Sequence, residues 1–234
     1  MKIMGVDPSI TRTGISLPDH TTFAIKPPRP ILGDDRLEYF ADHIGLAARS
    51  AGVDLVVMED APTTLLGNAG RVLLHLQGAV RLELKRNKTP YMILSPSTLK
   101  KFATGSGAAD KDAMAASALQ LLGRTYGTND ECDADWLRIA GRMAYGLPEV
   151  KDVPFPSLAV DRILTMPQDQ LQALRWAGTG KKRHAIFWPE VGGRRPWPLI
   201  GLRGVVLYDE GQPHAPGKAV LCQMCAGVGH MVCR

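Results

Sequence analysis

Four acidic side chains lie in three separated segments, each beside a predicted strand end or helix start. Asp7 follows the apolar stretch KIMGV, Glu59 follows DLVVM, and Asp130 and Asp133 begin the helical pattern NDECDADWLRIAG. Residues three apart on a helix share a face, and sites in open sheets form beyond the strand ends, so the four acids can converge. Carboxylate oxygens suit Mg²⁺ or Mn²⁺. Two such ions about 4 Å apart can activate water and stabilise the leaving oxygen in phosphodiester hydrolysis.

Three of these acids also have a plainer explanation. A buried carboxylate at Asp7 is costly unless it is paired, and a capping hydrogen bond would pair it as well as a metal would. Asp130 and Glu131 would complement the dipole of the helix that they begin. Glu59 and Asp60 can be read as solvated loop residues after an apolar strand. Only the joint pattern favours a metal site.

The surrounding sequence predicts the elements that would position these acids. Strands are expected at 2–6, 13–17, 21–26, 53–58 and in YMILSP, and helices over about 36–51, 69–87, 109–123 and 131–145. The second and third strands are joined by the short segment PDH, which indicates an antiparallel meander. This order of elements predicts an α/β domain with a mixed sheet flanked by helices.

The texture of the chain changes near residue 150, where proline and glycine become frequent. We therefore expect one domain over 1–150 and a smaller C-terminal extension over 151–234. Residues 1–150 carry 17 basic and 17 acidic side chains, whereas 151–234 carry 11 and 6, so the extension holds the whole net charge of +5. A basic region favours a polyanion partner, with nucleic acid first. A solvated basic face is the alternative.

The sequence has no feature of a membrane or secreted protein. No apolar run approaches the roughly 20 residues that a membrane helix needs. Asp7 interrupts the N-terminal apolar stretch, so no signal-peptide pattern forms. We therefore expect an intracellular, cytoplasmic protein, in which clustered cysteines favour metal binding over disulfides.

Such a cluster lies at the C-terminal end of the sequence. Cys222, Cys225, His230 and Cys233 follow the spacing C-x2-C-x4-H-x2-C. Three thiolates and one imidazole would complete a tetrahedral, structural zinc site over 222–233, similar to a zinc knuckle. Reduced cysteines are the alternative, and in another variant His184 or His214 supplies a ligand.

Five motifs resemble those of RuvC-type Holliday-junction resolvases and occur in the same order over about residues 1–146. GVDPSITRTG resembles the first motif of that family, and VVMED resembles the second strand with its catalytic glutamate. NAGRVLLHLQGAV is similar to the helix that follows, SPSTLKKFATGSGAADKDAM to the lysine-containing segment, and DECDA to the last acidic pair. The compact layout and the cysteine-rich tail resemble phage-borne members more than bacterial ones.

The resemblance implies an RNase H-like fold with a mixed five-stranded sheet, a homodimer, and a metal-dependent nuclease that cuts branched DNA, above all four-way junctions. On this reading Asp7, Glu59, Asp130 and Asp133 are catalytic and bind two Mg²⁺ or Mn²⁺ ions. Asp135 offers a rival register for the last acid, because DWLRIA also matches a family pattern. We prefer Asp130 with Asp133, since that register keeps both acids and the alanine after them.

One departure from the family concerns the segment after the catalytic glutamate. RuvC-type enzymes commonly place an aromatic residue there to open the junction, whereas this chain has EDAPTTLLGN. Leu65 or Leu66 can substitute for it. Otherwise the preferred substrate is a looser branch or a flap.

Basic residues near the acids are candidates for DNA binding. Lys100, Lys101 and Lys111 flank TGSGAAD, and the resemblance implies that Lys100 and Lys111 contact the DNA backbone near the scissile phosphate. Such contacts position a substrate without reading its sequence. Lys181, Lys182 and Arg183 are interleaved with aromatic residues in the extension, a pattern that suits nucleic acid. The alternatives are exposed surface lysines in the first group, and a small aromatic core or dimerisation module in the extension.

Three other functions remain open at this point. One is an RNase H-like nuclease that acts on flaps or RNA–DNA hybrids, and another is a non-catalytic, zinc-bearing DNA-binding protein. The third is an ATPase of the actin-like class, whose phosphate loop resembles D-x-S-x-T-x-T-G. That class usually has a glycine where Ser9 stands here.

Overall fold

The computed structural model of the chain describes residues 1–61, 67–145, 147–150 and 152–154, together with the backbone of four short strands between 208 and 233. The chain divides into two compact units, Met1–Pro196 and Trp197–Arg234, and the acidic residues of interest all lie in the first. Among the described residues, no helix combines the length and hydropathy that a membrane span requires.

The first unit is built on a five-stranded mixed sheet. Its strands are β1 (Ile3–Asp7), β2 (Thr13–Ser16), β3 (Thr22–Ile25), β4 (Leu55–Glu59) and β5 (Tyr91–Leu94), in the order β3-β2-β1-β4-β5. β1, β2 and β3 form an antiparallel meander, and β4 and β5 continue the sheet parallel to β1. The predicted α/β class with a mixed five-stranded sheet is therefore confirmed.

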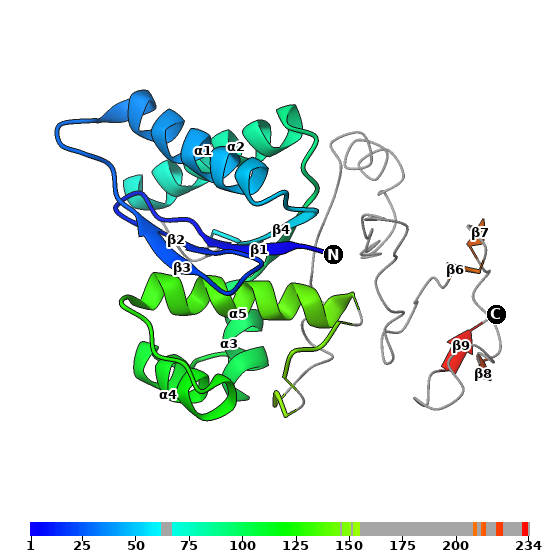
Figure 1. Cartoon of the computed structure of the whole chain (residues 1–234). Coiled ribbons are helices and arrows are strands. Elements are labelled where there is room, and N and C mark those ends of the chain that lie inside the picture. Colours follow the sequence, from blue (N-terminus) through cyan, green and yellow to red (C-terminus); the bar gives the residue numbers. More distant parts are fainter. Residues whose placement is uncertain are drawn as a thin grey trace. The chain divides into compact units, whose positions relative to one another are not determined.

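Helices cover both faces of this sheet (Figure 1). α1 (Gly33–Ser50) and α2 (Asn68–Arg86) pack together on one face, and α5 (Asn129–Ala144) lies directly on the other. α3 (Pro96–Thr104) and α4 (Lys111–Leu122) pack against the outer side of α5. α5 is thus the central helix, in contact with the sheet on one side and with two helices on the other.

The helix α3 is an element that sequence reasoning missed, because its first residues were assigned to the preceding strand. β5 ends at Leu94, and Ser95 then caps the helix by accepting a hydrogen bond from the Thr98 N–H at 3.3 Å. Pro96 stands in the first turn, where its missing N–H is not needed. A serine followed by proline before an apolar pattern is a helix-start signal, so the local sequence did contain this information.

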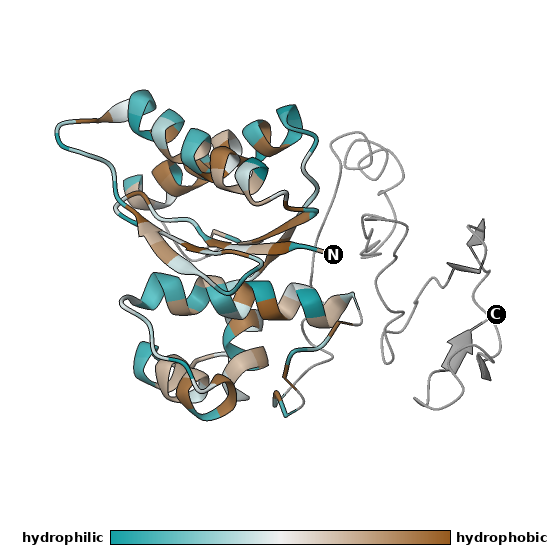
Figure 2. Ribbon diagram, in the orientation of Figure 1, coloured by the Kyte–Doolittle hydropathy of each residue, from teal (hydrophilic) through white to brown (hydrophobic). Residues whose placement is uncertain are grey.

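Alternation along the strands separates two layers of side chains. Met4 and Val6 of β1 point with Val56 and Met58 of β4 into the hydrophobic core beneath α1 and α2. The intervening residues, which include Gly5, face α5 instead, because successive side chains of a strand point to opposite faces. Figure 2 shows mainly hydrophobic strands between helices that carry both hydrophobic and hydrophilic residues.

Two glycines let α5 lie unusually close to the sheet. A Cβ added at Gly5 would come within 1.8 Å of the carbonyl oxygen of Ala134, and one at Gly14 within 1.9 Å of the carbonyl oxygen of Asp130. Any side chain at either position would therefore push the N-terminal half of α5 away from β1 and β2. The family-like glycines of GVDPSITRTG thus fix the distance between two of the segments that carry acids.

The described part of the C-terminal region consists of two short antiparallel pairs. β6 (Tyr208–Asp209) pairs with β7 (Gln212–Pro213), and β8 (Ala219–Leu221) pairs with β9 (Met231–Cys233). Upstream, the structure also describes residues 152–154, of which Val153 is buried. The boundary predicted near residue 150 is not tested by these residues and stays a prediction.

Candidate active site

Asp7 and Glu59 are neighbours because β1 and β4 are adjacent parallel strands. The register pairs Val6 with Met58, so Asp7 and Glu59 come next on the two strands, at the carboxyl edge of the sheet. Both side chains fall on the face that α5 covers. Asp7 is buried, with 9% of its surface exposed, and its carboxyl group shares a hydrogen bond with that of Glu59.

The first turns of α5 bring the other two acids to this edge. Thr128 caps the helix by accepting a hydrogen bond from the Glu131 N–H at 3.2 Å, which fixes where the helix begins. Asp130 and Asp133 then lie three residues apart on one helical face. Their charges act on Asp7, and the close approach at Gly14 explains why they reach it.

The electrostatics of the cluster are those of carboxyl groups that lack sufficient positive charge. Burial raises the pKa of Asp7 well above its usual range, and the charges of Glu59, Asp133 and Asp130 raise it further. Burial, followed by the charge of Asp133, raises the pKa of Glu59 to about 8. Burial and the charge of Asp130 raise the pKa of Asp133 to about 6. Each carboxylate therefore makes ionisation of its neighbours less favourable.

Three basic side chains partly offset this repulsion. The charge of Lys100 lowers the pKa values of Glu59 and Asp133, and the charge of Lys111 also lowers the pKa of Asp133. Arg12, in the loop after β1, donates from Nε to Asp130 Oδ2 at 2.6 Å. Sequence reasoning did not single out Arg12, although its place five residues after Asp7 was a usable signal.

The donor set fits a hard divalent cation. All four groups offer carboxylate oxygens, the ligands that Mg²⁺ and Mn²⁺ prefer. A cation would relieve the repulsion that raises the pKa values of Asp7, Glu59 and Asp133. As the side chains lie, no three potential ligands in the described part of the chain are grouped closely enough to hold one ion. Binding a metal therefore requires at least one carboxylate to turn inward.

Asp135, the rival for the last acid, belongs to a different cluster. It is fully buried and accepts hydrogen bonds from Ser16 at 2.6 Å, Tyr126 at 2.7 Å, Arg124 at 2.7 Å and Arg138 at 2.8 Å. Although burial raises it, the pKa of Asp135 is lowered overall, mainly by the charge of Arg138. Its lone pairs and its charge are already matched, so the structure separates Asp135 from the acids at the sheet edge.

This chain is similar in sequence to several proteins that share one name. A protein of Anaeromyxobacter sp. named "Crossover junction endodeoxyribonuclease RuvC" is 29% identical over 169 residues, which cover 65% of this chain and 80% of the relative. Its namesake from Maricaulis maris is 30% identical over 142 residues, which cover 57% of this chain and 86% of the relative. The chain belongs to the RuvC family. No protein-family model matches it.

Solved RuvC structures share the fold. The structure of Thermus thermophilus RuvC has a TM-score of 0.53 and 17% identity, and covers 64% of this chain and 100% of that one. The same protein in complex with Holliday junction substrate has a TM-score of 0.54. The RNase H-like fold expected from the RuvC-type motifs is therefore confirmed.

The structure describes some of the remaining predicted site residues and not others. Lys100 and Lys101 lie on α3, with Lys101 exposed, and Lys111 is the first residue of α4. Several predictions lie outside the described residues: the candidates Leu65 and Leu66 for junction opening, the basic residues Lys181, Lys182 and Arg183, and the side chains of the predicted zinc ligands Cys222, Cys225, His230 and Cys233.

Proposed function

We propose that this protein is a metal-dependent endonuclease that resolves Holliday junctions and related branched DNA. The observation that carries the proposal is the meeting of Asp7, Glu59, Asp130 and Asp133, from three segments, at one edge of a RuvC-type fold. Structural acids would be matched by bases, as Asp135 is. The charges of these acids instead raise the pKa values of Asp7, Glu59 and Asp133, as expected of ligands that await a cation.

In the proposed mechanism the four carboxylates would hold two divalent ions, Mg²⁺ or Mn²⁺. Such ions supply an activated water and stabilise the leaving oxygen of the phosphodiester. The charges of Lys100 and Lys111 act on the acids, which supports a role for both lysines in attracting the scissile phosphate. Gly5 and Gly14 keep α5 close to β1 and so hold the two halves of the ligand set together.

The test uses a labelled synthetic four-way junction with Mg²⁺, beside a linear duplex, a flap and an RNA–DNA hybrid. We expect paired symmetric nicks with 5′-phosphate and 3′-hydroxyl ends on the junction, abolished by Asp7→Asn. Asp34→Asn is the matched control, because Asp34 is an exposed acid on α1, across the sheet from the site. Cleavage of flaps or hybrids instead would keep the metal chemistry and change the substrate. If the protein binds the junction but cleaves no substrate with either Mg²⁺ or Mn²⁺, the proposal that it is a nuclease is refuted.

A homodimer is part of the proposal, because a symmetric junction calls for two active sites. Leu74 and Leu82 support it, since they lie eight residues apart on α2 with 58% and 49% of their surfaces exposed. Residues at that spacing share one face of a helix. Light scattering of the purified protein should give twice the chain mass, and Leu74→Glu with Leu82→Glu should give the single mass.

For the C-terminal extension we propose a structural zinc site that assists DNA binding. The support is the C-x2-C-x4-H-x2-C spacing together with the antiparallel pairing of Leu221 with Met231, because Cys222, Cys225 and His230 lie between these two residues in the sequence. The domain boundary near residue 150 and a phage origin, with action in the host cytoplasm, belong to the same proposal. Elemental analysis should find one zinc per chain, lost in Cys225→Ser.

A further inference from the structure

Arg12 forms an ion pair with one particular acid of the cluster, Asp130. Its Nε donates to Asp130 Oδ2 at 2.6 Å, across 118 residues of sequence. The Arg12 side chain is 42% exposed and that of Asp130 is 20% exposed. By contrast, the described residues provide neither Asp7 nor Glu59 with an arginine partner. The ion pair thus occupies an oxygen of the acid that stands at the rim of the cluster.

The ion pair with Arg12 involves one of the acids that would have to turn inward to hold a metal ion. Asp130 is near enough for its charge to act on Asp7 and Asp133. Yet no three ligands among the described side chains are grouped around a common point. We propose that Arg12 is an internal counter-ion that holds Asp130 away from the metal position, and that a divalent ion must displace it. Arg12 is therefore a positioning residue, and the inference rests on the proposed metal site.

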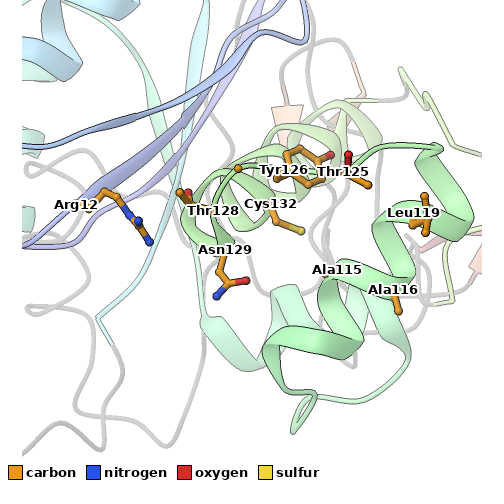
Figure 3. Close-up of a pocket in the computed structure, with 10 residues that line it drawn as sticks. Arg12, Ala115, Ala116, Leu119, Thr125, Tyr126, Thr128, Asn129 and Cys132 are labelled. Atoms are coloured by element: carbon orange, nitrogen blue, oxygen red, sulfur yellow. The ribbon is translucent and has the colours of Figure 1, made fainter.

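The surroundings of Arg12 allow such a displacement. Arg12 lines a cavity of about 530 Å³, together with Thr128 and Asn129 at the start of α5 (Figure 3). The figure shows Arg12 extending from the loop after β1 toward these two residues. Its guanidinium group is therefore not enclosed by packed side chains. Once Asp130 turns toward a metal, the cavity leaves room for the released cation.

The loop itself does not depend on Arg12. The Thr13 hydroxyl donates to the Ser9 carbonyl at 3.0 Å, and the Ser9 N–H donates to the Thr13 hydroxyl at 3.1 Å. Arg36 Nε donates to the Ile10 carbonyl at 2.7 Å and ties the loop to α1. Replacing Arg12 therefore removes one charge and one hydrogen bond without removing the contacts that shape the loop.

The experiment measures metal binding without catalysis. Mn²⁺ is titrated into metal-free protein, and the free ion is followed by its electron paramagnetic resonance signal. Breaking a partly exposed ion pair changes an equilibrium by roughly two- to fivefold, so we expect Arg12→Gln to bind Mn²⁺ tighter by that factor. Arg49→Gln is the matched control, because Arg49 makes a comparable ion pair with Glu83 at 2.9 Å. It should leave the affinity unchanged.

A second comparison identifies the partner through which Arg12 acts. In an Asp130→Asn background the ion pair is already lost, so Arg12→Gln should no longer tighten Mn²⁺ binding. A gain that persists in this background would mean that Arg12 acts through the general field, and it would overturn the proposal. Weaker binding by Arg12→Gln alone would also overturn it, because Arg12 would then orient Asp130 as a ligand. If Arg12→Gln binds Mn²⁺ with the affinity of the wild type, the ion pair is a surface contact without effect on the metal, and the proposal is refuted.

These failures are distinguishable from failure of the proposed function. Asp7→Asn is titrated in parallel. If neither the wild type nor Arg12→Gln binds Mn²⁺ in a manner that depends on Asp7, the metal site is refuted and the inference with it. If binding depends on Asp7 but Arg12→Gln does not tighten it, the metal site stands and only the role of Arg12 is refuted.

Discussion

Glu59→Gln should make the metal-free protein more stable and abolish its nuclease activity. The pKa of Glu59 is raised from 4.5 to about 8, first by burial and then by the charge of Asp133. A group whose pKa is raised on folding binds more protons in the folded state than in the unfolded state. The free energy of unfolding therefore falls as pH rises from about 4.5 to about 8. Glutamine keeps the shape of the side chain and has no proton to lose, so this loss disappears.

The size of the effect follows from the shift. At pH 7 a displacement of the pKa from 4.5 to about 8 corresponds to about 3 kcal/mol, because one unit is worth about 1.4 kcal/mol. Glu59 is partly exposed at its strand end, which reduces the penalty. We therefore expect Glu59→Gln to be more stable by about 1–3 kcal/mol at pH 7 and equally stable near pH 4. Asp7 and Asp133 give the same sign of slope, and that part remains in the variant.

The assay is urea unfolding between pH 4 and 8.5 in the presence of a chelator. Glu83→Gln is the matched control, because hydrogen bonds from Asn87 and Arg49 lower the pKa of Glu83, so that its neutralisation should not stabilise the protein. Added Mn²⁺ should raise the stability of the wild type at pH 8 more than that of Glu59→Gln. If Glu59→Gln is no more stable than the wild type at pH 8 without metal, the description of Glu59 as a charge-strained ligand is wrong.

Three further perturbations test how the site is held. Gly14→Ala would place a Cβ 1.9 Å from a carbonyl oxygen of α5. We expect the free energy of unfolding in urea to fall by about 1–3 kcal/mol. The cleavage rate should fall about a hundredfold, which is the usual effect of a shift near 1 Å. The control Gly78→Ala, whose Cβ meets no atom within 4 Å, should keep the stability and the cleavage rate of the wild type. Arg138→Met removes one hydrogen-bonding cation from the buried Asp135 and should lower the free energy of unfolding by about 3–5 kcal/mol in the same assay. A decrease of less than about 1 kcal/mol would contradict a buried, mutually dependent network. Lys100→Ala should weaken junction binding and reduce the slope of log affinity against log salt by about one, whereas an unchanged slope would exclude a phosphate contact.

Much of the fold was predictable because its strands and helices follow local sequence patterns. Alternating or continuous apolar stretches located all five strands of the sheet, and apolar spacing located α1, α2, α4 and α5. α3 was missed because YMILSP was read as one strand, although Ser95 and Pro96 form a helix start. The error came from counting Ser95 and Pro96 with the strand and assigning no helix to the residues that follow, although a serine cap and a proline in the first turn signal a helix start.

The acids show where local reasoning stopped. Asp130, Asp133 and Asp135 all belong to one acidic stretch, and spacing alone offered two registers for the last ligand. The structure turns Asp133 toward Asp7, and it turns Asp135 toward Arg138 and Ser16 on the other side of the helix. Two residues along a helix correspond to a rotation of about 200°, so neighbouring acids of similar appearance meet opposite environments.

The sequence by itself determined which residue types are present, which strands end on acids and which glycines leave room beside them. Those facts depend only on neighbours along the chain. The tertiary structure alone decided that β1 lies beside β4, that Gly14 receives the first turn of α5, and that Arg12 meets Asp130 across 118 residues. Burial, raised pKa values and ion pairing all depend on distance and on the exclusion of water, and these exist only after the segments have packed together.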